Sequence, residues 1–227
     1  PKYYFISGSG NKRSFTKKNL KMISKSLNQE QKKYSIDLCG GDTTFSKKLS
    51  FTITSVGFSN KIVFRNRAKL NDDIYVTGNL GDSFVGLKVL QKKIHLNKDL
   101  TKYFKERYYH PNLHLDITKK LLSFANTSID VSDGLFADLD KLINKQKLSY
   151  KIYLKKIPIS KSLNKLINLK ILKKISSVSC GDDYQILFTA SPENALPSAI
   201  PMTVFFVFAV IPSVTFCSTP PSEYRLL

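Results

Sequence analysis

Cysteine is scarce in this chain of 227 residues, which contains only Cys39, Cys180 and Cys217. Three cysteines so far apart form neither a disulfide framework nor a zinc-binding set, so we expect a reducing, cytoplasmic location. Long apolar runs are absent as well. The apolar run 202–211 has only ten residues, whereas a membrane-spanning helix needs ~20. No basic segment followed by an apolar one indicates a signal peptide, so we expect no membrane partner.

Arginine is also rare, although the chain is strongly basic. The formal net charge is +19, yet only five of the 36 basic residues are arginine. Proteins that bind nucleic acids commonly use arginine for bidentate contacts to bases and phosphates. The lysines come in short pairs over most of the chain, with no block of five or six like charges. A lysine-rich proteome therefore explains the charge better than a nucleic-acid partner.

The rest of the composition is that of a folded chain with an unusual end. Hydrophobic residues make up 42% and charged residues 23%, which excludes a disordered chain, a collagen-like fibre and a coiled coil. Residues 191–227 contain no lysine, and we expect them to be a divergent tail in which 202–211 forms one buried strand. Because a strand-like sequence follows Pro1 at once, we expect the chain to begin inside a domain.

Helix-like and strand-like segments alternate, which predicts an α/β (α+β) fold without internal repeats. We expect strands at 3–6, 35–39, 49–58, 73–77, 128–131, 149–153 and 184–189. We expect helices at 16–31, 81–92, 98–109, 112–125, 134–144 and 160–168. Asp82 or Ser83 is placed to cap the helix 81–92. Leu135, Leu139 and Leu142 share one face of the helix 134–144, which predicts that this face is buried.

Three acidic junctions carry the chemical signal, and the first is 39–44 (CGGDTT) after a predicted strand. Its two glycines let the backbone approach a ligand closely. Exposed N–H groups beside Asp42 suit a phosphate bound together with Mg²⁺. Taken alone, however, the motif is more typical of an ordinary turn between two strands.

The second junction is 129–135 (IDVSDGL). Strand alternation places Asp130 and Ser132 on one face and Asp133 at the turn into the next helix. Two carboxylates this close repel each other unless a cation lies between them, and Mg²⁺ takes one or two carboxylates with phosphate oxygens and water. The alternative is that Asp133 merely caps the helix; because a cap needs only one acid, the second favours a metal.

The third junction, 180–184 (CGDDY), precedes the strongest predicted strand. A glycine turn again presents paired acids, although an ordinary solvated turn is the alternative. Asp183 fits a structural role better and Asp182 fits a ligand role better, a choice that spacing alone leaves open.

No other catalytic motif competes with these junctions. The sequence has no GxxxxGK[ST] phosphate-binding loop and no GxSxG nucleophile motif. Its three histidines form no zinc-binding pattern. His110 and His114 are four residues apart, but Pro111 between them is expected to start a helix, which favours an ordinary surface pair.

Taken in order, the motifs resemble those of the thiamine-monophosphate kinases. The segment 40–44 is similar to the family's GGDTT, and 49–54 (LSFTIT) is similar to the strand that follows it. Three further family motifs resemble 65–78, which ends in DIYVTG, 79–83 (NLGDS) and 107–111 (RYYHP). Finally, 129–139 (IDVSDGLFADL) resembles IDxSDGLxxDL, and 181–189 (GDDYQILFT) resembles GGEDYELLFT. The resemblance extends over about residues 1–195.

The resemblance implies a two-domain architecture like that of aminoimidazole ribonucleotide synthetase, with the first domain only partly present. Residues 1–57 would be the C-terminal part of the ATP-binding and dimerisation domain, and residues 58–227 the second α/β domain. It also implies a homodimer when the protein is full length.

The reaction implied is transfer of the ATP γ-phosphoryl group to thiamine monophosphate, which yields thiamine diphosphate. By the same resemblance the Mg²⁺ ligands are Asp42, Asp130 and Asp133, of which Asp133 is the catalytic one. ATP would contact Gly41, Asp42, Arg65 and Ser132.

Asp182 would face thiamine monophosphate. Here the sequence departs from the family, because Cys180 replaces a glycine and Asp182 replaces a glutamate, which shortens the contact by one methylene group. We therefore expect this chain by itself to be weakly active or inactive.

Three alternatives stay open. The chain could be another ATP-dependent enzyme of the same superfamily, a non-catalytic basic binding module, or an inactive remnant.

Overall fold

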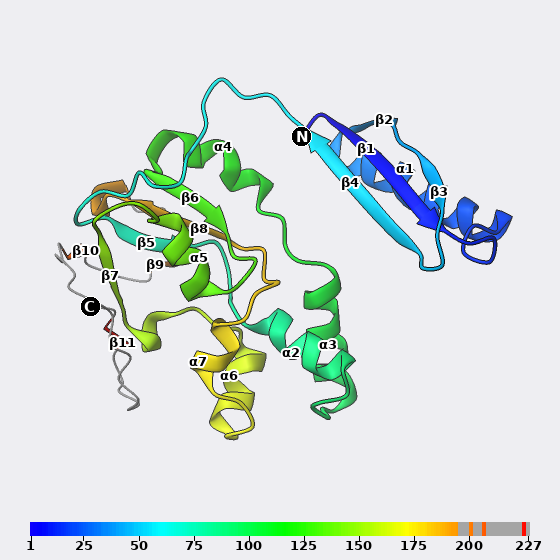
Figure 1. The fold of residues 1–227 in the computed structure, drawn as a ribbon. Coiled ribbons are helices and arrows are strands. Elements are labelled where there is room, and N and C mark those ends of the chain that lie inside the picture. Colours follow the sequence, from blue (N-terminus) through cyan, green and yellow to red (C-terminus); the bar gives the residue numbers. More distant parts are fainter. Residues whose placement is uncertain (195–199, 202–205, 208–223, 226–227) are drawn as a thin grey trace. The chain divides into compact units, whose positions relative to one another are not determined.

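The computed structural model describes residues 1–194, 200–201, 206–207 and 224–225. It divides into two compact units, Pro1–Lys61 (unit 1) and Ile62–Leu227 (unit 2), shown in Figure 1. The assignment of 1–57 and 58–227 to two family domains stays a prediction. The divergent tail from about 191 and the strand 202–211 lie largely outside the described residues.

Unit 1 is a four-stranded sheet with one helix. The central strand β1 (Tyr3–Gly10) is parallel to β2 (Asp37–Gly40) near its start and to β3 (Thr43–Phe45) near its end. On its other side β1 pairs antiparallel with β4 (Ser50–Val56). The helix α1 (Lys17–Tyr34) begins after Thr16, whose hydroxyl accepts a hydrogen bond from the Asn19 N–H at 3.2 Å.

Apolar side chains of unit 1 are largely exposed. Tyr4 is its one buried hydrophobic residue, and every residue of β2, β3 and β4 is exposed. Phe51 and Ile53 on β4 are 42% and 58% exposed. Unit 1 therefore has little hydrophobic core of its own.

Unit 2 is built on an antiparallel sheet with the strand order β6-β8-β5-β9. Its strands are β5 (Asp73–Val76), β6 (Thr127–Asp130), β8 (Ile186–Ala190) and β9 (Ile200–Pro201). A second, smaller sheet places β7 (Ser149–Ile152) between β10 (Phe206–Val207) and β11 (Tyr224–Arg225).

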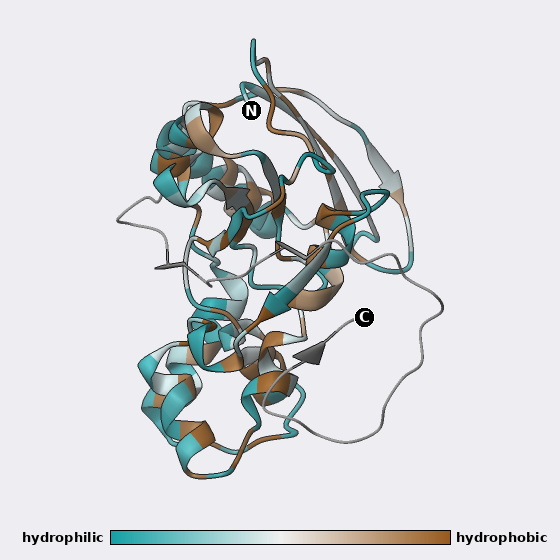
Figure 2. Ribbon diagram, turned by 90° about the vertical axis from the view of Figure 1, so that its left-hand side faces the viewer, coloured by the Kyte–Doolittle hydropathy of each residue, from teal (hydrophilic) through white to brown (hydrophobic). Residues whose placement is uncertain are grey.

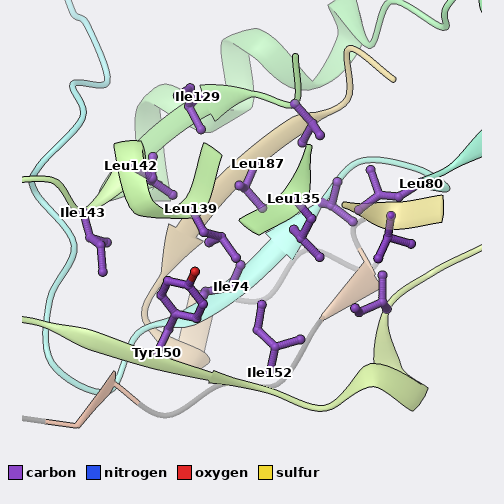
Figure 3. Packing of buried hydrophobic residues seen from close by; sticks show 14 of the residues in the cluster. Ile74, Leu80, Ile129, Leu135, Leu139, Leu142, Ile143, Tyr150, Ile152 and Leu187 are labelled. Carbon is purple, nitrogen blue, oxygen red and sulfur yellow. The ribbon is translucent and has the colours of Figure 1, made fainter. Parts of the chain in front are cut away.

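Strand alternation gives the main sheet two apolar faces. Ile74 and Leu187 point into a core that is completed by α5 (Leu135–Leu142) and β7 (Figure 3). Tyr75 and Phe188 point to the opposite face, where their stacked rings lie 5.2 Å apart under α4 (Leu115–Phe124). Because helices cover both faces, the sheet is buried and its strand ends become the places where polar residues reach solvent.

A third apolar cluster joins three further helices of unit 2. Val85 of α2 (Asp82–Leu90) and Phe104 of α3 (Lys98–Tyr109) pack with Leu163 and Leu166 of α6 (Lys161–Asn168). The short elements are α7 (Lys174–Val178) and the 3₁₀ turns η1 (Leu154–Lys156) and η2 (Pro192–Asn194). Figure 2 shows hydrophilic and hydrophobic residues alternating around the helices, as expected when one face of a helix is buried.

The predicted helices and strands that lie within the described residues correspond to observed elements. The observed elements that were not predicted are all short: β3, α7, β9, β11 and the turns η1 and η2. α4 begins at Leu115, so Pro111 does not start it and His110 and His114 lie in the preceding loop. The buried leucine face of α5 is confirmed, because Leu135, Leu139 and Leu142 are all fully buried.

In the part of the chain that the structure describes, no helix has the length and apolar character that crossing a membrane requires.

The packing of α5 predicts a large stability difference between two leucines. Leu139→Ala should lower the free energy of unfolding by about 2–5 kcal/mol, because it leaves a cavity in the core. Leu169→Ala, at a site that is 60% exposed, should cost no more than about 0.5 kcal/mol. Urea unfolding followed by circular dichroism measures both, and equal losses would show that the core is not organised around α5.

Candidate functional site

The second acidic junction lies where β6 passes into α5. β6 ends at Asp130, and α5 begins at Leu135. Ile129 and Val131 are buried, whereas Asp130 and Asp133 are exposed. Strand alternation thus anchors the segment through its apolar residues and presents Asp130 to solvent, while Asp133 is exposed in the turn that follows the strand.

A carboxylate from inside the helix holds this loop. Asp138 is fully buried, and its Oδ2 accepts hydrogen bonds from the N–H groups of Ser132 (2.8 Å), Asp133 (2.8 Å) and Gly134 (3.1 Å). The alternative that Asp133 caps α5 is wrong, because Gly134 occupies the N-cap position and no side-chain cap hydrogen bond is formed there. Since Asp138 accepts them, these three N–H groups are not available to bind a phosphate.

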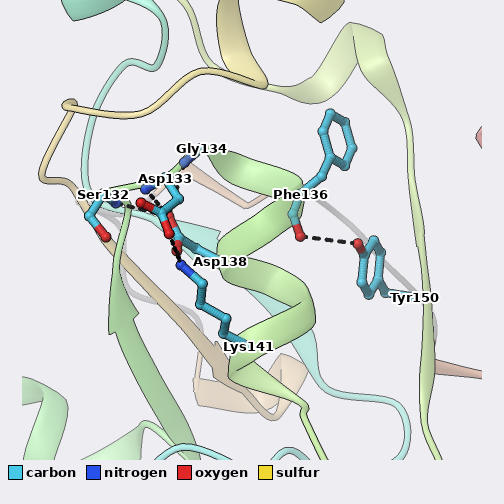
Figure 4. Close-up of polar contacts among 7 residues, drawn as sticks. All are labelled: Ser132, Asp133, Gly134, Phe136, Asp138, Lys141 and Tyr150. Atoms are coloured by element: carbon cyan, nitrogen blue, oxygen red, sulfur yellow. Dashed lines mark hydrogen bonds and ion pairs between the residues drawn. The ribbon is translucent and has the colours of Figure 1, made fainter.

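Lys141, one turn beyond Asp138, completes the cluster. Its ammonium group donates to Asp133 Oδ2 and, at 2.8 Å, to Asp138 Oδ1 (Figure 4). Both hydrogen bonds raise the pKa of Lys141, that to Asp133 most. The buried charge of Asp138 is thus compensated by three N–H groups and one cation.

The third acidic junction packs directly against the second. A Cβ atom on Gly181 would lie 1.7 Å from the Ser132 carbonyl oxygen, so only glycine fits there. The Asp182 N–H donates to that same oxygen at 3.0 Å, and the Tyr184 N–H donates to the Val131 carbonyl at 2.9 Å. Asp182 and Tyr184 both have the left-handed backbone (φ 66° and 50°) that non-glycine residues seldom adopt.

The structure therefore brings Asp130, Ser132, Asp133 and Asp182 into two adjoining loops of unit 2. Asp182 is half-buried, and its Oδ1 accepts a hydrogen bond from the Tyr184 hydroxyl at 3.3 Å. Burial, together with the negative charges of Asp182 and Asp130, raises the pKa of Tyr184.

Asp183 has a structural role, as the sequence favoured. Its buried carboxylate accepts hydrogen bonds from the N–H groups of Gly81 (2.7 Å) and Ser83 (3.2 Å). The N-terminus of α2 is thus capped from a distant part of the sequence, and the prediction that Asp82 or Ser83 caps it is wrong. Burial, with a further contribution from Asp82, raises the pKa of Asp183 to about 7.

Asp183 also lines a polar cavity of about 230 Å³ that the sequence did not predict. The Asp82 carboxylate accepts hydrogen bonds from the hydroxyls of Ser160 (2.6 Å) and Tyr103 (2.8 Å), and burial raises its pKa. His114 is half-buried there, with its Nε2 2.8 Å from Gln185 Oε1, so it is not an ordinary surface histidine. The cavity is lined by Thr77, Gly78, Asn79, Asp82, Ser83, Tyr103, Arg107, Pro111, Asn112, His114, Asp183 and Gln185.

Arg65 is exposed and follows Phe64, whose carbonyl oxygen accepts a hydrogen bond from the hydroxyl of Thr127, the first residue of β6, at 2.7 Å. Among the described residues, Arg65 forms no ion pair with Asp130 or Asp133.

In unit 1, Gly41 and Asp42 form a tight connection between β2 and β3. A Cβ atom on Gly41 would lie 1.7 Å from the Ile6 carbonyl oxygen, so packing against β1 alone requires this glycine. The Asp42 side chain is exposed, and its Oδ1 accepts a hydrogen bond from the Thr43 N–H at 2.7 Å. Asp42 thus presents a carboxylate to solvent, as Asp130 and Asp133 do in unit 2.

The exposed carboxylates have the chemistry that Mg²⁺ prefers. Among the described residues, no group of three or more His, Cys, Asp or Glu is arranged to enclose a metal ion. Mg²⁺ does not need such a cage, since it commonly takes one or two carboxylates and completes its coordination with substrate phosphates and water. Cys39 and Cys180 are free thiols.

Curated relatives of this chain are thiamine-monophosphate kinases. The one from Buchnera aphidicola (subspecies Schizaphis graminum) is 38% identical over 179 residues, which cover 77% of this chain and 54% of that protein. The one from Haemophilus influenzae is 36% identical over 175 residues, 75% of this chain and 52% of that protein. The chain thus spans about half the length of the curated relatives it matches. No family model matches it.

Solved structures confirm the predicted fold. The thiamine monophosphate kinase of Aquifex aeolicus superposes with a TM-score of 0.83 at 26% identity, covering 91% of this chain and 70% of that one. AaThiL complexed with AMPPCP and TMP gives a TM-score of 0.82 at 26% identity, covering 91% and 67%. HypE from Escherichia coli shares the fold at 14% identity, with a TM-score of 0.69 and coverage of 92% and 68%.

The burial of Asp183 predicts a pH dependence of stability. Because folding raises its pKa from 3.8 to about 7, the folded chain keeps a proton that the unfolded chain releases. The free energy of unfolding should therefore fall by a few kcal/mol, as an order-of-magnitude estimate, between about pH 4 and pH 7, and level off above. Asp183→Asn keeps an acceptor for the N–H groups but does not titrate. Urea unfolding of both proteins across this range gives their free energies of unfolding. The value of the unaltered protein minus that of the variant should decline as the pH rises, and a constant difference would contradict the raised pKa of Asp183.

Proposed function

We propose that this homologue of the thiamine-monophosphate kinases transfers the γ-phosphoryl group of ATP to thiamine monophosphate, forming thiamine diphosphate and ADP. The observation that carries this proposal is the match to curated kinases over 77% of the chain, in which the motif residues form two adjoining loops. A relative of the same fold has been complexed with AMPPCP and TMP. Free thiols support a cytoplasmic setting for the reaction.

In this proposal the exposed aspartates hold Mg²⁺. Asp42 of unit 1 and Asp130 and Asp133 of unit 2 are the ligands, and all three carboxylates are exposed. When bound, Mg²⁺ neutralises the charge that phosphoryl transfer concentrates on the phosphate oxygens. The loss of Asp133 should lower activity most, because its position is fixed by the buried Asp138 and by the partly exposed Lys141.

Ser132, Gly41 and Arg65 are proposed contacts of ATP. Since Asp138 occupies the Ser132 N–H, the Ser132 hydroxyl is the group left to bind a phosphate oxygen. Arg65 follows Phe64, whose carbonyl oxygen is bound by the hydroxyl of Thr127 at the start of β6. The exposed guanidinium group suits an anionic or planar partner.

Asp182 is the proposed contact of thiamine monophosphate. Its backbone is fixed on the Ser132 carbonyl, next to the proposed phosphate site. Its carboxylate is one methylene group shorter than the glutamate of the resembling family motif, so the contact should be weaker here.

We further propose that the full-length protein is a homodimer through the domain to which unit 1 belongs. The exposed apolar side chains of β4 are the kind of surface that a second subunit covers. Another enzyme of the superfamily is less well supported, since the likeness to HypE concerns the fold alone. A basic nucleic-acid-binding module is less well supported as well.

The proposal is tested by formation of thiamine diphosphate from thiamine monophosphate and Mg-ATP. The chain should be assayed alone and joined to the part of the Buchnera relative that it does not cover. Asp133→Asn should lower turnover of the joined chain about 10²-fold or more, because a charged metal ligand is lost. Asp99→Asn, an exposed acid on α3, is the matched control. A joined, folded chain without turnover would contradict the proposed function.

The short acid at position 182 gives a separate prediction. Asp182→Glu should lower the KM for thiamine monophosphate several-fold and leave the KM for ATP unchanged, because the longer side chain restores the reach to the substrate. Steady-state kinetics of the joined chain measure both constants. An equal change in both would remove Asp182 from the thiamine monophosphate site.

A further inference from the structure

Two charged side chains of α5 that are not proposed ligands, Asp138 and Lys141, form a polar cluster with Asp133. Asp138 is fully buried, while the side chains of Lys141 and Asp133 are 40% and 63% exposed. The three groups form a graded series from the core to the surface (Figure 4). Such a series does more than hold the loop, since the loop N–H groups use only one oxygen of Asp138.

The role of Asp138 follows from how its two oxygens are used. Oδ2 accepts the N–H groups of three consecutive residues, Ser132, Asp133 and Gly134. Ser132 and Asp133 precede α5, and Gly134 is the residue at its N-cap position, so this oxygen holds the loop that leads into the helix. One acceptor for all three fixes the backbone of the loop, and with it the direction in which the Asp133 side chain leaves the chain.

The role of Lys141 follows from what its departure would leave behind. The ammonium group binds Asp138 Oδ1 at 2.8 Å, and this oxygen has no exposure to water. If Lys141 moved away, a buried carboxylate oxygen would lose its compensating charge, which is strongly unfavourable. Lys141 is therefore anchored, and it holds Asp133 by Oδ2 alone. Among the described residues Asp133 Oδ1 has no hydrogen-bond partner, and it is left to face solvent.

We propose that Asp138 and Lys141 are positioning residues that hold the Asp133 carboxylate with one oxygen tied and the other presented to a divalent cation. The inference rests on the proposed function in taking Asp133 as a metal ligand. It differs from two other roles for Lys141. If Lys141 instead competed with the cation for Asp133, its removal would tighten cation binding. If it formed a purely structural ion pair, its removal would change stability alone.

The experiment is a Mn²⁺ titration of the joined chain in the presence of AMPPCP, followed by electron paramagnetic resonance of the free ion. Lys141→Met should weaken Mn²⁺ binding about 10-fold or more, as is typical when a group that orients a metal ligand is removed. Lys141→Arg, which keeps the charge, should recover part of the affinity. Lys165→Met, an exposed lysine on α6, is the control and should bind as the unaltered chain does. Unchanged or tighter binding by a folded Lys141→Met protein would overturn the proposal.

Amide hydrogen exchange gives a readout that needs no metal. In Asp138→Asn the N–H groups of Ser132, Asp133 and Gly134 should exchange at least about 10-fold faster, because the charged acceptor they share is gone. The N–H groups in the middle of β8 should keep their protection, which would show that the fold is intact. Unchanged exchange at the three positions would overturn the role of Asp138. If instead the unaltered joined chain binds no Mn²⁺, the proposed function fails, and the exchange result still decides whether Asp138 fixes the loop.

Discussion

Backbone contact between two loops is the constraint on which the candidate site of unit 2 depends. The Ser132 carbonyl oxygen lies where a side chain at position 181 would begin, and it accepts the Asp182 N–H at 3.0 Å. Gly134 is constrained in the same way, because its Cβ atom would lie 2.2 Å from the Ser179 carbonyl oxygen. The positions of Asp133 and Asp182 are therefore coupled, and a change in one loop displaces the acids of both.

Buried acids organise the surroundings of the exposed ones. Asp138 and Asp183 each hold backbone N–H groups of a loop that precedes a helix. Asp72 does similar work further away, because it accepts hydrogen bonds from Asn126 and Thr189, both at 2.8 Å. Asp183 and Asp72 join segments that are distant in sequence, and Asp138 joins a helix to the loop before it. Among the described residues, Asp130 and Asp133 accept no hydrogen bond from a backbone N–H group. The Asp130 carboxylate and the Oδ1 atom of Asp133, whose Oδ2 binds Lys141, are therefore available to a ligand.

The sequence predicted well those features that depend on local pattern. The alternation around Asp130 predicted its face of the strand, and the spacing of Leu135, Leu139 and Leu142 predicted the buried face of α5. It could not predict that Asp138 turns back onto three N–H groups, because spacing does not give the direction of backbone donors. Nor could it assign the cap of α2 to Asp183, since that contact spans about a hundred residues and exists only after folding.

The exposed strand β4 has a consequence for the colloidal behaviour of the chain. Ser50–Val56 (SFTITSV) carries no charge and no proline, and among the described strands it pairs only with β1. Its other edge offers free N–H and C=O groups, which is the template on which strands of other molecules stack into aggregates. Lys47 and Lys48 lie just before it, and the net charge of +19 makes copies of the chain repel one another. Salt screens that repulsion, so ionic strength decides how long the chain stays dispersed in a concentrated preparation.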